Sequence, residues 1–142
     1  MRALLDVNVL IALLDQDHAM HVQAQRWFAG RAASGWASCP ITQNGCVRIM
    51  SHPNYPNPLK VAAIMERLGE ATARTEHEFW PDDISVLDVR VVDRSRIHGP
   101  RQVTDLYLLA LAVHHGGCFA SFDASIPRTG VRGVEREHLV TL

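Results

Sequence analysis

The chain has 142 residues, 47% of them hydrophobic, and a formal net charge of −1 at pH 7. This length and apolar content predict one domain spanning residues 1–142, with a core that needs no disulfide or metal. The near-zero charge argues against a strongly basic protein that binds nucleic acid regardless of sequence. We expect no membrane helix and no secretory signal, and three cysteines without C-x-x-C spacing predict buried thiols in a reducing cytoplasm.

The first half of the chain alternates short apolar runs with helical patterns. We expect a buried strand at 2–5, an apolar helix at 9–14, an amphipathic helix at 18–33 and a second strand at 36–39. After Pro40, Thr42 is a candidate N-cap for a helix that runs through Met50. Three prolines in residues 51–58 then predict a rigid loop.

The second half continues the same alternation. We expect an amphipathic helix at 59–75, turns and strand at 77–92, a helix at 102–115, and strands at 118–122 and 138–142. Gly116 and Gly117 mark the end of the last helix. Short apolar strands that alternate with helices predict a three-layer α/β/α domain with a mainly parallel central sheet.

Three aspartates occupy related positions in this predicted fold. Asp6 follows the first strand, Asp123 follows a late strand, and Asp105 lies in the first turn of the last long helix. Ligands of open parallel sheets bind beyond the carboxyl ends of the strands. Carboxylates gathered there would repel one another unless a cation joined them, and oxygen ligands favour Mg²⁺ or Mn²⁺. The pattern therefore indicates a metal site.

Each aspartate also has a purely structural interpretation. Asp6 is suited to cap the following helix, Asp105 is a favourable first-turn acid, and Asp123 is suited to an Asx turn. For any one aspartate taken alone, the structural interpretation is the better supported. For the three aspartates taken together, the metal site is the better supported.

Four segments resemble, in order and spacing, the successive motifs of PIN-domain toxins of the VapC type. They are LLDVNVLIA at 4–12, CPITQNGCVR at 39–48, VTD at 103–105 and FASFD at 119–123. The resemblance implies a PIN-like fold and a metal site at Asp6, position 43, Asp105 and Asp123. It also implies a homodimeric endoribonuclease that cuts RNA with Mg²⁺ or Mn²⁺ and is inhibited by a cognate VapB-type antitoxin. Such a toxin of a type II toxin–antitoxin pair would block translation and growth.

Position 43 departs from the family pattern, because Gln43 stands where Glu is usual. Its carbonyl oxygen can still bind a metal or a water, but it brings no charge and cannot act as a base. Two interpretations stay open: an active nuclease with one charge fewer, and an attenuated PIN domain that binds RNA and antitoxin without efficient cleavage. The mechanism implied by the resemblance is hydrolysis of a phosphodiester by a metal-activated water. Asp6 and Asp105 would be its principal ligands, and Asp123 would hold a second ion or orient the water.

Several other side chains are candidates for supporting roles, each with a surface or capping alternative. Thr104, Ser121 and Asn8 are candidates to hydrogen-bond the metal ligands. We expect Arg48 to form a structural ion pair, and Arg94, Arg96 and Arg101 either to meet RNA phosphates or to be solvated. His114 and His115 favour the negative end of the last helix, and His18 and His21 are expected at the surface.

Two other enzyme classes also place an aspartate after the first strand. Haloacid-dehalogenase-type phosphatases need a second Asp two residues later, where this chain has Asn8. Both they and response-regulator receivers need a lysine after a later strand, and the single lysine, Lys60, opens a helix instead. Both readings are therefore poor.

Overall fold

In the computed structural model, which describes residues 1–142, five strands form one sheet in the order β3-β2-β1-β4-β5. The strands are β1 (Ala3–Leu5), β2 (Trp36–Ser38), β3 (His77–Phe79), β4 (Cys118–Ser121) and β5 (Leu139–Thr141). Every pairing is parallel. The expectation of a mainly parallel sheet is confirmed, and the three inner strands are buried throughout, as parallel strands covered on both faces should be.

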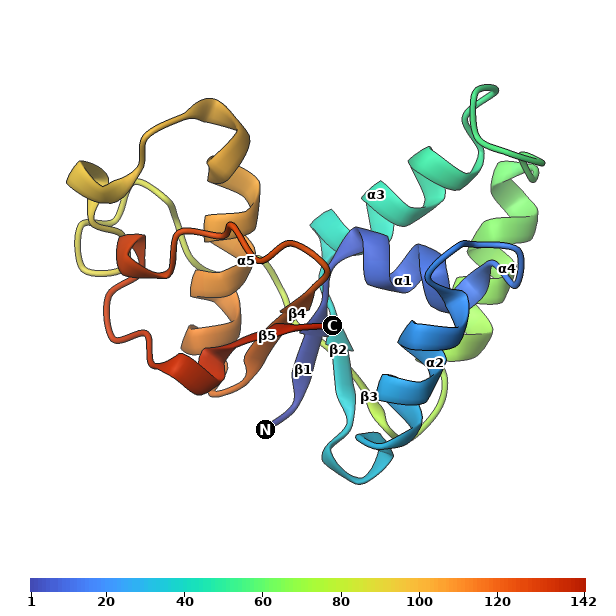
Figure 1. Cartoon of the computed structure of the whole chain (residues 1–142), viewed down its shortest axis with the longest axis horizontal. Coiled ribbons are helices and arrows are strands. Elements are labelled where there is room, and N and C mark those ends of the chain that lie inside the picture. Colours follow the sequence, from blue (N-terminus) through green and yellow to red (C-terminus); the bar gives the residue numbers. More distant parts are fainter.

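Helices cover both faces of the sheet, so the three-layer α/β/α architecture is also confirmed. The helices are α1 (Val7–Leu14), α2 (His21–Ala29), α3 (Pro40–Met50), α4 (Val61–Thr72) and α5 (Val103–His114). The first four lie together on one side of the sheet, and α5 lies on the other (Figure 1). Crossover helices of this kind are what parallel strands require.

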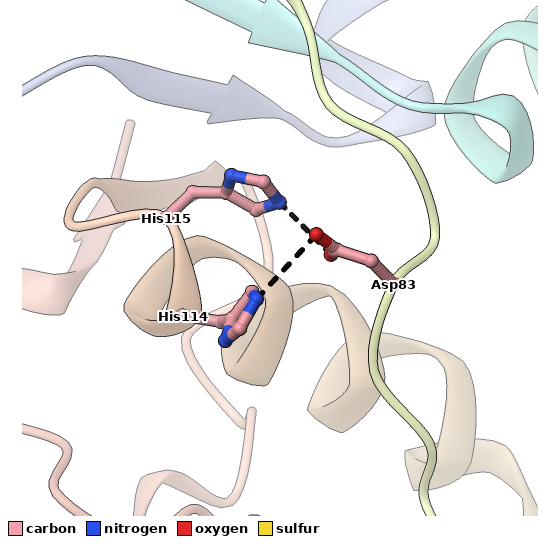
Figure 2. A group of neighbouring side chains, drawn as sticks. All are labelled: Asp83, His114 and His115. Atoms are coloured by element: carbon pink, nitrogen blue, oxygen red, sulfur yellow. Dashed lines mark hydrogen bonds and ion pairs between the residues drawn. The ribbon is translucent and has the colours of Figure 1, made fainter.

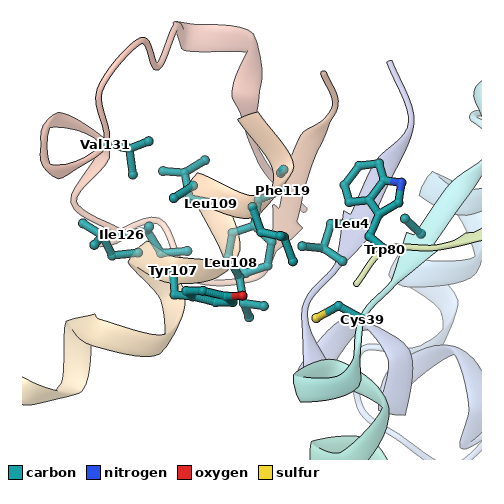
Figure 3. Packing of buried hydrophobic residues seen from close by; sticks show 14 of the residues in the cluster. Leu4, Cys39, Trp80, Tyr107, Leu108, Leu109, Phe119, Ile126 and Val131 are labelled. Atoms are coloured by element: carbon teal, nitrogen blue, oxygen red, sulfur yellow. The ribbon is translucent and has the colours of Figure 1, made fainter. Parts of the chain in front are cut away.

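Two apolar cores result, one on each face. Successive strand residues point to opposite faces, so Leu4 packs toward α5 while Leu5 packs toward α1–α4. Figure 3 shows the α5 side, where Leu108 and Phe119 meet Leu4 of the central strand. The central strand therefore fixes the position of both helical layers.

Three expected elements are shorter in the structure than the sequence predicts. The helix expected at 18–33 spans only His21–Ala29, because the Met20 N–H donates to Nδ1 of His18 in a turn before it. A 3₁₀ turn follows it at Ala32–Ser34. The helix expected at 59–75 is α4, Val61–Thr72, and in region 77–92 only His77–Phe79 forms a strand.

Thr42 does not cap α3, because the helix begins three residues earlier than expected. Pro40 is its first residue, where the missing N–H costs nothing. Cys39 is thus the N-cap residue, and Oγ1 of Thr42 accepts a 3.0 Å hydrogen bond from the Cys39 N–H. The hydroxyl still satisfies a backbone group at this end of the helix, but from inside it.

All three cysteines are buried free thiols, as expected. No helix has the length and apolar character needed to cross a membrane.

Candidate active site

Asp6 lies at the carboxyl end of the central strand, with 7% of its surface exposed. It caps α1, and its Oδ1 accepts a 2.7 Å hydrogen bond from the Val7 N–H. Its Oδ2 accepts a 2.6 Å hydrogen bond from Oγ of Ser121 in β4. Burial raises the pKa of Asp6; the two hydrogen bonds oppose that rise, and the Asp123 carboxylate adds to it. The capping role is therefore present, and the same carboxylate is tied to the neighbouring strand.

Asp105 lies half-buried in the first turn of α5. Burial, followed by the carboxylates of Asp6 and Asp123, raises its pKa to about 6, and no hydrogen bond from the protein offsets that rise. A first-turn acid does interact favourably with the helix dipole. An unpartnered carboxylate among like charges is nevertheless a place that a bound cation would stabilise.

Asp123 lies two residues beyond β4 and is exposed. Its Oδ1 accepts hydrogen bonds from the backbone N–H and the hydroxyl of Ser125, at 2.7 and 2.6 Å, which is the expected Asx turn. These bonds lower the pKa of Asp123 and keep it ionised. The Asp123 N–H also donates to Oγ of Ser121 at 3.1 Å. Ser121 therefore links Asp6 and Asp123 through one hydroxyl.

The structure thus brings the three predicted aspartates into one electrostatic environment at the carboxyl edge of the sheet. Their oxygens are not all within 4.8 Å of one another, so the group is open. The donors are carboxylates only, which is the chemistry that Mg²⁺ and Mn²⁺ prefer and that suits zinc less well. The carboxylates of Asp6 and Asp123, which help to raise the pKa of Asp105, create a negative potential that attracts such a cation. Donor type and charge both fit a hard divalent ion.

Gln43 forms its hydrogen bond away from the three aspartates. Its Nε2 donates a 2.9 Å hydrogen bond to Oγ of Ser38, which shares a 2.8 Å hydrogen bond with Nε2 of His77. By strand alternation Ser38 lies on the same face as Trp36, the face covered by α1–α4, whereas Asp105 belongs to the helix on the opposite face. No hydrogen bond joins Gln43 to the three aspartates.

Of the candidate supporting residues, Ser121 alone contacts one of the three aspartates. Thr104 and Asn8 are exposed, and neither side chain has a hydrogen-bond partner. Arg48 forms no ion pair, contrary to expectation; its side chain is exposed on α3 beside a groove shared with α4. The three arginines before α5 are exposed, and two of them have local partners: Arg94 with the Leu87 carbonyl and Arg96 with Asp93.

The histidine pairs differ from each other. His18 and His21 are half-buried rather than on the open surface, and each bonds a backbone group. His114 and His115 end α5, as expected, but both also meet the Asp83 carboxylate from the loop after β3 (Figure 2). Sequence reasoning missed Asp83, because no local signal joins it to residues more than 30 positions away.

An apolar groove of 440 Å³ runs between α1, α2 and α4. Its apolar walls include Leu10, Leu13 and Leu14 of α1, Phe28 of α2, and Leu68 and Ala71 of α4. It lies on the helical layer opposite α5.

Comparisons with known proteins agree on one family. The PIN domain profile matches residues 3–131. The chain is 57% identical over 142 residues to Ribonuclease VapC44 of Mycobacterium tuberculosis, covering 100% of both chains. It is 42% identical over 135 residues to Ribonuclease VapC39 of the same organism, covering 94% of this chain and 97% of that one. A crystal structure of VapBC2 from Rickettsia felis, bound to a DNA fragment from its promoter, superposes with a TM-score of 0.63. The superposition covers 100% of this chain and 98% of the Rickettsia chain. Because the sequence identity is 11%, the match supports the fold alone.

Proposed function

Because the chain belongs to the PIN-domain family, in its VapC branch, we propose that it is a metal-dependent endoribonuclease. We propose further that it acts in the cytoplasm as the toxin of a type II toxin–antitoxin pair, cutting RNA and thereby blocking translation and growth. The full-length similarity to two proteins named ribonucleases supports the activity.

The observation that carries the proposal is the shared environment of Asp6, Asp105 and Asp123 at the carboxyl edge of the sheet. These three carboxylates would hold Mg²⁺, with Mn²⁺ as a substitute. When bound, the ion supplies Lewis-acid chemistry, polarising the phosphodiester and activating the attacking water. Asp6 is held in place by Val7 and Ser121, and Ser125 holds Asp123, so both are oriented before any ligand arrives. The carboxylate of Asp105, free of protein donors, is the one available to respond to the ion.

We propose the partners from the family membership and from the acidic edge of the sheet. RNA is the substrate, and its phosphates approach the acidic edge together with the bound cation. A VapB-type antitoxin is the inhibitor, and a homodimer is the expected assembly. A second copy or an antitoxin would cover exposed apolar side chains such as Val61 and Met65, which lie on α4 at 47% and 58% exposure. Light scattering of the free protein tests the dimer, and a monomeric mass would refute it.

A second candidate function follows from Gln43. An amide bonded to Ser38 brings no charge to the three aspartates, and on this second account the domain is an attenuated form that binds RNA and antitoxin but cuts slowly. Its cation affinity would then be lower than that of a four-acid site.

Cleavage of total cellular RNA by the purified protein separates the two functions. We expect cutting that requires added Mg²⁺ or Mn²⁺ and stops with EDTA. RNA binding without cleavage, in either metal and across many RNAs, would support the attenuated form and refute the nuclease.

A further inference from the structure

A second group of metal-binding side chains lies away from the three aspartates. Nε2 of His115 is 3.0 Å from Oδ1 of Asp83, and Nε2 of His114 is 3.5 Å from Oδ2 of the same carboxylate. One ligand atom from each residue lies within 4.8 Å of the others, and no other three-residue group of His, Cys, Asp or Glu is as close. In Figure 2 both rings point toward the carboxylate from the end of α5.

These distances match those between neighbouring ligands of a tetrahedral metal. With bonds of about 2.0–2.1 Å, such ligand atoms stand roughly 3.3 Å apart. The separations of 3.0 Å to Oδ1 and 3.5 Å to Oδ2 of Asp83 lie on either side of that value. All three ligand atoms lie within 4.8 Å of one another, so a cation would replace the direct His–Asp contacts after the side chains draw together around it.

The group is partly preorganised. The His115 ring stacks on Trp80, with ring centroids 4.8 Å apart and planes 10° from parallel. Trp80 is itself 2% exposed, and its backbone N–H donates to the Ser38 carbonyl at the end of β2. His115 is therefore held against a rigid part of the core, and Asp83 comes from the same chain segment as Trp80.

The group is independent of the proposed nuclease centre. Asp105 and His114 lie at opposite ends of α5, nine residues apart, which is roughly 13 Å along a helix. The donors differ as well, because two imidazoles and one carboxylate favour Zn²⁺, Co²⁺ or Ni²⁺, whereas three carboxylates favour Mg²⁺ and Mn²⁺.

We propose that Asp83, His114 and His115 form a second cation site that takes a first-row transition metal, Zn²⁺ or its analogues Co²⁺ and Ni²⁺. The bound ion would fasten the loop after β3 to the carboxyl end of α5. Three protein ligands leave a fourth position for water, and an open cleft lined by Asp82 and His114 lies beside the group. Asp88, also in that cleft, is paired with Arg90 and does not compete for the ion.

Cobalt binding to the untagged protein tests this proposal, since bound Co²⁺ absorbs visible light according to its ligands. We expect the wild type to bind Co²⁺ with a tetrahedral spectrum that Zn²⁺ abolishes and excess Mg²⁺ does not. The variants His114→Gln and Asp83→Asn should each weaken binding by about tenfold or more. His98→Gln, an exposed histidine before α5, is the matched control and should bind as the wild type does.

Two further variants keep the outcome unambiguous. Asp6→Asn should retain the tetrahedral Co²⁺ spectrum, because it alters only the aspartate centre. His114 is exposed, so His114→Gln should keep the wild-type circular dichroism spectrum and its metal-dependent RNA cleavage. A tetrahedral Co²⁺ spectrum that survives both His114→Gln and Asp83→Asn, or that disappears in Asp6→Asn, would overturn the proposal, as would a wild type that shows no such spectrum.

Discussion

The hydroxyl of Ser121 donates a 2.6 Å hydrogen bond to Oδ2 of Asp6, across 115 positions of sequence. The bond forms because β1 and β4 pair in parallel with Leu5 opposite Ala120, so the next residue on each strand also meets its partner. Ser121 is 1% exposed and its Oγ also accepts from the Asp123 N–H. One buried hydroxyl thus holds the main carboxylate of the proposed metal site and the turn that carries another.

Replacing Ser121 with alanine should weaken the site without unfolding the protein. The lost donor leaves Oδ2 of Asp6 unpaired, which favours the protonated acid and raises its pKa further. We expect metal-dependent RNA cleavage to fall by about 10- to 100-fold at neutral pH. Ser125→Ala, which removes only the hydroxyl donor to the exposed Asp123 and keeps the backbone N–H donor, should cost less. Equal cleavage rates for Ser121→Ala and the wild type would contradict this role.

Asp105→Asn should stabilise the metal-free protein at neutral and alkaline pH. The folded-state pKa of about 6 lies above the ordinary value of 3.8, so ionising Asp105 costs stability as pH rises between these values. The cost is fully present above pH 6 and absent below the ordinary pKa. With solvent screening of this half-buried group, we expect a gain of about 1 kcal/mol.

Urea unfolding at several pH values measures this effect. The two unfolding curves should coincide in acid, separate as pH rises from the ordinary pKa of 3.8 to about 6, and stay apart above pH 6, with the variant more stable. Added Mg²⁺ should stabilise the wild type and not the variant, because ligand binding to the folded state raises its stability. Asp88→Asn is a control that should lower stability at neutral pH instead of raising it. Hydrogen bonds with Arg90 lower the pKa of the Asp88 carboxyl, so its ionised form favours the folded state. A variant less stable than the wild type above pH 6 would contradict the account.

Gln43→Glu should change RNA cleavage little. The side chain at this position bonds Ser38 on the face of the sheet away from α5, so a new carboxylate would act mainly on His77 through that network. We expect the pKa of His77 to rise, observed by NMR, and cleavage to stay within about threefold, less than 1 kcal/mol in the barrier. A gain well beyond tenfold would instead support the attenuated form and assign position 43 to the metal site.

Gly45 allows α1 and α3 to pack closely beside Asp6. A Cβ at this position would lie 2.8 Å from Cγ2 of Val7, the first residue of α1. Gly45→Ala should therefore destabilise the protein by about 1–3 kcal/mol, despite the better helix propensity of alanine. Gly69→Ala in α4 is the matched control, because nothing lies within 4 Å of its Cβ, and it should stabilise by up to about 1 kcal/mol. Thermal unfolding of both variants checks the pair, and a Gly45→Ala protein as stable as the wild type would refute the packing argument.

The sequence predicted those parts of the fold that local patterns encode. Apolar runs located the inner strands, and the position of Asp6 after the first strand placed its carboxylate at the sheet edge. Thr42 was misplaced because Pro40 suits the first helical position as well as the position before a helix. Region 77–92 has no clear period, so the single short strand within it was not resolved from the turns around it.

Contacts between distant segments could not be predicted from spacing. The pairing of Gln43 and His77 through Ser38 depends on the parallel pairing of β2 and β3 and on how α3 packs against α1. The Asp83–His115 contact likewise requires that the loop after β3 pass the end of α5. Both are consequences of topology, which short motifs do not carry.

Manganese binding tests the central claim most directly, because it asks whether the three aspartates hold a hard divalent ion. Free Mn²⁺ is measured by electron paramagnetic resonance in titrations of the wild type, Asp6→Asn and Asp105→Asn, with His114→Gln as the control outside the site. We predict that the wild type and His114→Gln bind Mn²⁺ equally, and that both aspartate variants bind at least about tenfold more weakly and lose RNA cleavage. Wild-type Mn²⁺ affinity in Asp6→Asn and Asp105→Asn would contradict the account.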